Sequence, residues 1–271
     1  GPVISSFDPK QGSAGQYVTI SGRGFGAKRG ADPNKSKVYF GGTLNAQGQV
    51  VGGVEADFNF PTICSDSIWS DKQVIVKVPT GLTTDTGYKI IMQIAKGGGQ
   101  FWTIDTSDLT PSEFNFDSTL SLAPSLCKIE PIIGKVNSQV SLYGEYFGAN
   151  SEDYSKVRFQ LNHDQVGAAV TFWGVDPEAV PAGTRKPDKA VTTVHQNAVT
   201  GPVKAVKDID AKAGNGLNFK VGVCSKSEEC GTGNLCCSAG TPYAGECKDI
   251  TGAKKTEQEV FEILEDMKKE D

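Results

Sequence analysis

Histidine is scarce in this chain, and so are the motifs that catalytic sites need. Only 2 of the 271 residues are histidine, His163 and His195, and neither belongs to a recognisable catalytic arrangement. There is no Gly-x-Ser-x-Gly, no phosphate-binding glycine loop and no His-Glu-x-x-His. Asp32, or the pair Glu152 and Asp153, could hold Ca²⁺, but no Asp-x-Asp-x-Asp-Gly spacing supports such a site. We therefore predict a protein that is not an enzyme and has no cofactor and no metal.

Long apolar runs and an excess of positive charge are also missing. No stretch approaches the roughly 20 apolar residues that span a bilayer, so we expect no membrane insertion by these residues. Lys and Arg number 27 against 32 Asp and Glu, which gives a formal net charge of −5 at pH 7. Because a mildly acidic chain has no general attraction for nucleic acid, we expect no nucleic-acid partner.

Glycine, by contrast, is abundant, and the chain contains a long internal repeat. The 32 glycines predict many turns, as in all-β folds. Residues 7–26 and 129–148 match at an offset of 122 positions. The identical pairs are Pro9 and Pro131, Gly12 and Gly134, Val18 and Val140, Gly22 and Gly144, Phe25 and Phe147, and Gly26 and Gly148. A period of this length is the size of a whole domain, so we infer a domain duplication.

The repeated segments have the alternation of half-buried β-strands. Val18 and Ile20 alternate with Tyr17 and Thr19 in the first copy. Further strands are predicted at residues 73–78, 87–94, 114–116, 201–206 and 217–223. Short strands without helical periods between them predict an all-β fold of two tandem immunoglobulin-like β-sandwiches.

The residues of the repeat resemble the IPT/TIG family. In the first copy the resemblance is carried by Pro9, Gly12, Gly15, Val18, Ile20, Gly22, Phe25, Gly26, Trp69, Ser70 and Pro79. IPT/TIG domains are immunoglobulin-like folds of plexin-type receptors, Rel-type transcription factors, starch-active enzymes and many bacterial surface proteins. The resemblance implies one sandwich at residues 1–119 and a second at 124–224. The second copy departs at Asn137, where a glycine is expected, and at residues 173–187, which look like an insertion.

Seven cysteines, five of them between positions 224 and 247, indicate a disulfide framework. The spacing in residues 224–248 resembles small knottin-like modules, and this glycine-rich segment has too few apolar residues to fold without cross-links. Zinc is the alternative, disfavoured because there is no Cys-x2-Cys pair and no nearby histidine. The candidates for disulfides are Cys127, Cys224, Cys230, Cys236, Cys237 and Cys247. We predict that Cys127 pairs with the C-terminal cluster and that Cys64 is a free thiol.

Residues 255–269 have the pattern of an amphipathic helix. Thr256 and Glu259 form a capping box, and Val260, Ile263 and Leu264 share one face. A helix of this length is marginal in water, so we expect it to pack on this protein or to begin another domain. A partner-binding or coiled-coil helix is the alternative.

Aromatic residues are the candidates for partner binding. Phe101 and Trp102 follow a triple glycine and could stack on a sugar ring or anchor a protein. Trp173 precedes a strand, where a core position is common, but it also begins the expected insertion and is a further candidate. Together these observations predict a non-enzymatic binding or adhesion module, extracellular or at the cell surface, with a protein or glycan ligand. The alternative is a structural stalk or an accessory, carbohydrate-binding region of a larger secreted enzyme.

Overall fold

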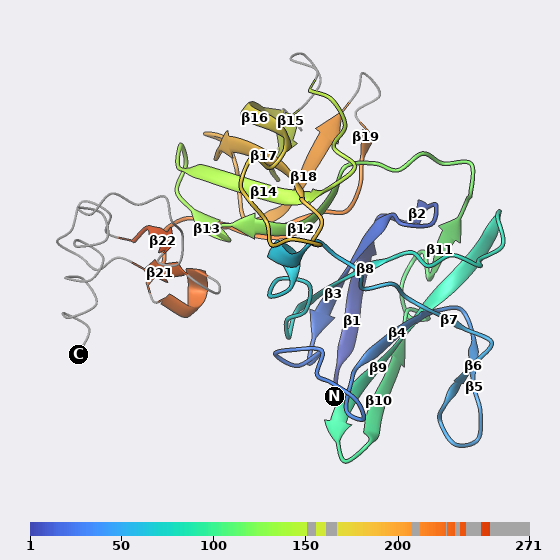
Figure 1. The fold of residues 1–271 in the computed structure, drawn as a ribbon. Helices are drawn as coiled ribbons and strands as arrows, with labels where there is room; N and C mark the ends of the chain where they lie inside the picture. The colour runs from blue at the N-terminus through green and yellow to red at the C-terminus, as the bar shows by residue number, and fades with distance from the viewer. Residues whose placement is uncertain are drawn as a thin grey trace.

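The computed structural model describes residues 1–150, 156–160, 167–207, 212–225, 227–230, 234–236 and 245–249 (Figure 1). Its regular structure is nearly all β-strand, as the alternation of apolar residues predicts. The helical elements within these ranges are two 3-10 turns, η1 (Thr62–Cys64) and η2 (Ser227–Cys230). No helix in the described ranges is long and apolar enough to cross a membrane. The helix predicted at residues 255–269 lies outside the described residues.

The strands from Val3 to Phe116 form what we call the first β-unit. They are β1 (Val3–Asp8), β2 (Gln11–Gly12), β3 (Tyr17–Arg23), β4 (Lys37–Phe40), β5 (Thr43–Leu44), β6 (Val50–Val51), β7 (Val54–Glu55), β8 (Gln73–Lys77), β9 (Thr86–Gly97), β10 (Gln100–Asp105) and β11 (Glu113–Phe116). One sheet has the order β1-β3-β8, a second has the order β2-β11-β9-β4-β7 with β10 paired to β9, and β5 and β6 form a separate two-stranded sheet. Buried side chains of the first two sheets, including Phe7, Ile20, Phe40 and Phe114, share one apolar core.

The strands from Ser125 to Val221 form the second β-unit. They are β12 (Ser125–Glu130), β13 (Ile133–Gly134), β14 (Gln139–Glu145), β15 (Lys156–Arg158), β16 (Gly167–Val175), β17 (Asp188–Thr193), β18 (Gly201–Lys207), β19 (Lys212–Ala213) and β20 (Leu217–Val221). The sheet order is β12-β14-β17-β16-β15-β18-β20-β13, with β19 paired to β18. Because β16 pairs with both β15 and β17, the strands of this unit form one continuous sheet.

The second unit repeats several strand pairings of the first, and its pair β12–β14 does so at the offset found in the sequence. In the first unit β1 and β3 are antiparallel and place Phe7 opposite Ile20. In the second unit β12 and β14 place Ile129 opposite Leu142. Each pair contains one register shift at the equivalent place, and β2 pairs in parallel with β11 as β13 does with β20. The repeat therefore extends to the register of the strands.

Gly22 and Gly144 show why glycine recurs at one position of the repeat. A Cβ on Gly22 would lie 2.0 Å from the carbonyl oxygen of Val3, and one on Gly144 would lie 1.7 Å from that of Ser125. Both glycines lie opposite the register shift, where the neighbouring strand approaches closely. The close approach of two backbones requires glycine at each place.

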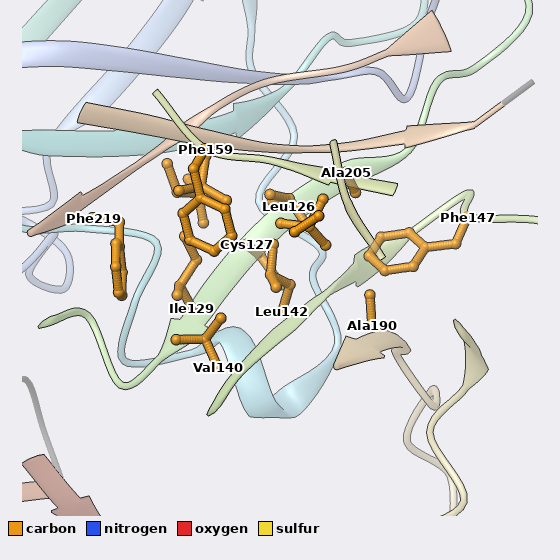
Figure 2. Packing of buried hydrophobic residues seen from close by; sticks show 14 of the residues in the cluster. Leu126, Cys127, Ile129, Val140, Leu142, Phe147, Phe159, Ala190, Ala205 and Phe219 are labelled. Atoms are coloured by element: carbon orange, nitrogen blue, oxygen red, sulfur yellow. The ribbon is translucent and has the colours of Figure 1, made fainter. Parts of the chain in front are cut away.

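The core of the second unit continues into the first. Figure 2 shows Leu126 and Ile129 of β12 directed toward Phe159, in the interior of the second unit. The same buried cluster includes Tyr17 of β3 and Ile75 of β8, which belong to the first unit. The two units therefore share apolar packing at a continuous junction.

The disulfides correct the predicted cysteine pairing. Cys64 is bonded to Cys127, with Cα atoms 5.6 Å apart and 63 residues between them in sequence. The predictions of a free Cys64 and of a bond from Cys127 to the C-terminal cluster are therefore wrong. The physical reason is that η1, which carries Cys64, folds back against β12 and β14 of the second unit. A contact across the junction has no signature in the spacing of cysteines.

The remaining cysteines of the described chain pair among themselves in what we call the Cys-rich segment, the described residues between 224 and 249. Cys224 is bonded to Cys236, and Cys230 to Cys247. Two strands, β21 (Asn234–Cys236) and β22 (Cys247–Asp249), form its small sheet. Cys237 lies outside the described residues.

Candidate functional site

The β9–β10 hairpin carries the predicted aromatic pair, at the end of the first unit away from the second (Figure 1). Its tip is the triple glycine, and all three glycines have positive φ, between 61° and 96°. Trp102 lies opposite Ile94 in the ladder and keeps 49% of its surface exposed, whereas Phe101 is half-buried. The Nζ atom of Lys96 lies 3.7 Å from the centroid of the Trp102 ring. The hairpin therefore presents an exposed indole whose orientation is supported by a cation–π contact.

Trp173, the third aromatic candidate, is not available to a partner. It lies on β16 and is 6% exposed, with its ring centroid 5.0 Å from that of Phe147. The first residues of the expected insertion, 173–175, are thus the end of a strand rather than a loop. The interpretation of Trp173 as a contact is corrected because its ring faces the buried core of the second unit and packs against Phe147.

A buried carboxylate, Glu145 of β14, holds the junction between the two units. It is 8% exposed and lies 2.9 Å from the ammonium of Lys77, which is 4% exposed. The guanidinium of Arg185 lies 2.6 Å from the other carboxylate oxygen of Glu145. The Tyr17 hydroxyl donates a hydrogen bond to the Glu145 carboxylate. Burial, and then the neighbouring Glu145 carboxylate, raise the pKa of the Tyr17 phenol well above its usual range, so the phenol remains a donor. Glu145 thus links residues of both units in one charge cluster.

Further hydrogen bonds, and an ion pair between Asp8 and Lys204, complete this junction. The fully buried Asn215 donates to the Thr19 hydroxyl at 2.9 Å and exchanges two hydrogen bonds with the backbone of Leu126. Asp8 of β1 accepts from Lys204 at 2.9 Å and from the backbone N–H of Gly216 at 2.8 Å. Buried polar groups that are satisfied in this way make the geometry specific. With the Cys64–Cys127 bond, they join the units into one body.

A cavity of about 640 Å³ opens beside the junction. Its lining comes from residues 66–73 of the first unit, from β12, β20, Ile132, Thr200 and Gly201 of the second, and from the start of the Cys-rich segment. Lys128 lies 3.4 Å from Asp66 and Lys220 lies 3.2 Å from Glu229 across its walls. The sequence carries no signature of this cavity, because its walls meet only in the folded chain.

The Cys-rich segment offers no thiolate cluster for a metal among its described residues. The sulfur atoms of Cys224, Cys230 and Cys247 lie within 4.8 Å of one another. Each of the three belongs to a disulfide bond. Since a metal ligand must be a thiolate, this group of sulfurs does not fit zinc.

Glu229 fastens the Cys-rich segment to β20. Its carboxylate accepts hydrogen bonds from the Ser225 backbone N–H at 2.7 Å, from the Ser225 hydroxyl at 3.1 Å and from Lys220 at 3.2 Å. The backbone hydrogen bond first, and then Lys220, lower the pKa of Glu229 to about 2. The ionised carboxylate is therefore the form that holds this contact.

We expect this contact to be released by acid. The pKa of Glu229 is lower in the folded chain than in the unfolded chain. The contribution of this contact to stability is therefore fully present above about pH 5 and is lost as the pH falls through about 2. The Ser225 amide resonance, followed by NMR from pH 6 to pH 1.5, should shift with a midpoint near pH 2. In Glu229→Gln that titration should vanish. A midpoint near the ordinary glutamate pKa of about 4.3 would contradict the assignment.

The first copy of the repeat has a counterpart among known families. Residues 2–49 match the sequence profile of the IPT/TIG domain. The resemblance is thereby confirmed for the start of the first unit, where Gly22, Phe25 and Gly26 lie. The match covers a small part of the chain. A search of curated proteins gave no match.

Solved structures give distant likenesses only. The chain is similar to an auxiliary nutrient binding protein from Bacteroides thetaiotaomicron, with 16% identity over 86% of this chain and 42% of that protein, at a TM-score of 0.26. A protein whose crystal structure was solved with a xylogluco-oligosaccharide has 16% identity to this chain. The match covers 83% of this chain and 43% of that protein, at a TM-score of 0.24. The Ig1-2 module of the Drosophila receptor protein tyrosine phosphatase DLAR has 13% identity to this chain. The match covers 82% of this chain and 99% of that module, at a TM-score of 0.23. The chain spans less than half the length of the first two, and likenesses of this size carry no argument about function.

Proposed function

We propose that this chain is a non-enzymatic binding module of a secreted or cell-surface protein, with two IPT/TIG-like sandwiches in tandem as its rigid scaffold. The observation that carries the proposal is the junction, where the Cys64–Cys127 bond and the buried Glu145 cluster join the two units. Disulfides persist in oxidising compartments, and three of them support an extracellular location. Exposed loops on such a scaffold are where binding is expected.

The repeated strand register supports the tandem arrangement. The family profile matches only within the first unit, but the second unit repeats its pairings and its glycine at the register shift. We place the domains at residues 1–119 and 124–224, followed by the disulfide-rich module at 224–248. On this division the shared core and the charge cluster lie at a domain interface.

The Trp102 hairpin is the proposed contact with a glycan or protein ligand. A tryptophan offers a large amphipathic surface and loses little side-chain entropy on binding. The β9–β10 hairpin lies at the end of the first unit away from the second, so a large ligand could approach it without meeting the second unit (Figure 1). The carbohydrate-binding alternative rests on this same exposed ring.

Trp102→Ala should abolish or weaken ligand binding by about tenfold or more while changing the free energy of unfolding by less than about 1 kcal/mol. The reason is that the ring is half exposed, so little packing is lost. Glycan and cell-surface protein arrays would measure binding, and calorimetry would measure stability. Leu44→Ala is the matched control, because Leu44 is a similarly exposed apolar residue on β5. Equal array binding by wild type and Trp102→Ala would exclude this contact.

A structural stalk is the second candidate, and the rigid junction favours it equally. The two candidates differ in one observable, because a stalk needs no ligand. If wild type binds nothing on either array and small-angle scattering gives a single rigid shape, the stalk is the better description.

A further inference from the structure

The junction cavity is separate from the Trp102 hairpin. Its volume, about 640 Å³, is within the range of ligand sites, and such sites favour domain interfaces. The buried ring of Phe219 and the partly exposed side chain of Ile132 supply apolar surface in its lining. The cavity therefore combines an apolar patch with the charged walls described above.

One open strand edge, that of β12, borders this cavity, whereas β20 on the other wall lies between β18 and β13. β12 ends the order of its sheet, and within the described chain the backbone groups of residues 128–130 have no hydrogen bonds outside the β12–β14 ladder. On the other wall, Asn218 of β20 lies opposite Pro202, which has no N–H. The Asn218 backbone N–H donates instead to the Gln73 side chain at 3.1 Å. Open strand edges are templates for pairing with another extended chain.

The charges of the cavity are not balanced. Lys128 is paired with Asp66 and Lys220 with Glu229, as described above. Lys72 also lines the cavity and has no ion pair within the part of the chain that the structure describes. An unpaired ammonium at the edge of an apolar patch favours a ligand that brings a carboxylate.

We propose that this cavity binds an extended acidic peptide segment of a partner protein. The peptide backbone pairs with the open edge of β12, one of its carboxylates meets Lys72, and an apolar side chain covers Ile132 and Phe219. This is recognition by strand addition, in which backbone hydrogen bonds give affinity and alternate side chains give specificity. A compact neutral ligand would use neither the strand edge nor the free ammonium. The site goes beyond the proposed function and does not depend on Trp102.

The test uses the full chain and a fluorescein-labelled heptapeptide of alternating valine and glutamate, with binding followed by anisotropy. We expect saturable binding. Replacing every glutamate by lysine should weaken it about tenfold or more, because the charge complementarity is reversed. N-methylation of alternate backbone nitrogens should weaken it similarly, because it removes the donors of a strand. Absence of binding by the valine–glutamate peptide, or equal binding of all three peptides, would overturn the proposal.

Variants locate the site. Lys72→Glu should weaken the peptide about tenfold or more, whereas Lys28→Glu, the same charge change on an exposed loop outside the cavity, should not. Trp102→Ala should leave peptide binding unchanged, which separates this site from the hairpin. Equal effects of Lys72→Glu and Lys28→Glu would overturn the assignment. Binding of polygalacturonate in place of the peptide, lost in Lys72→Glu, would also overturn it in favour of an acidic glycan.

Discussion

Replacing Glu145 by alanine should lower the free energy of unfolding by about 3–5 kcal/mol, because it leaves a buried ammonium without its counter-charge. Lys77 is almost fully buried and lies 2.9 Å from the carboxylate, so it cannot turn to solvent without unpacking the junction. The Tyr17 hydroxyl loses its acceptor at the same time. Arg185 contributes less to the loss, since about half of its side chain is exposed and can be hydrated. Chemical denaturation of wild type and variant measures the difference.

A double variant separates the missing charge from the missing volume. Glu145→Leu with Lys77→Met replaces the buried pair by apolar side chains of similar size, and such replacements are often neutral or stabilising. We therefore expect the double variant to be more stable than Glu145→Ala. A loss below about 1 kcal/mol in Glu145→Ala, or a double variant that is the less stable of the two, would show that the pair is not buried as described.

The sequence predicts the elements of this fold well, because they depend on local patterns. The alternation at Val18 and Ile20 places the strand β3, and the predicted segments 201–206 and 217–223 are strands β18 and β20 within a few residues. The repeated Gly22 and Gly144 mark where two backbones touch. Each of these signals concerns a strand and its nearest neighbour, which periodicity and turn residues report.

The junction and its site could not be predicted in this way. Glu145 occupies the repeat position of Arg23, and Lys77 follows three apolar residues of β8, but neither residue indicates its partner. A charged residue in a strand is normally a solvent-facing one, so only the contact between the units shows that these two are buried together. The same holds for Trp173, whose burial depends on its packing against Phe147 in the core of the second unit.

Cys64→Ala with Cys127→Ala should also be strongly destabilising. The bond closes a loop over a separation of 63 residues. Loop-closure entropy for such a length predicts a loss of about 4 kcal/mol. Both side chains are fully buried, so the lost sulfur packing adds to this loss. Denaturation under non-reducing conditions measures it.

The loop closed by this bond contains β8 to β11, the last four strands of the first unit, so the bond ties this part of the first unit to the beginning of the second. Cys224→Ala with Cys236→Ala is the matched control, with a separation of only 12 residues and an expected loss of about 3 kcal/mol that is confined to the Cys-rich segment. Peptide mapping without reductant should recover a Cys64–Cys127 peptide. If Cys64 instead alkylates as a free thiol in the folded protein, the junction is held by the Glu145 cluster and its hydrogen bonds alone. The double alanine variant would then lose only the sulfur packing.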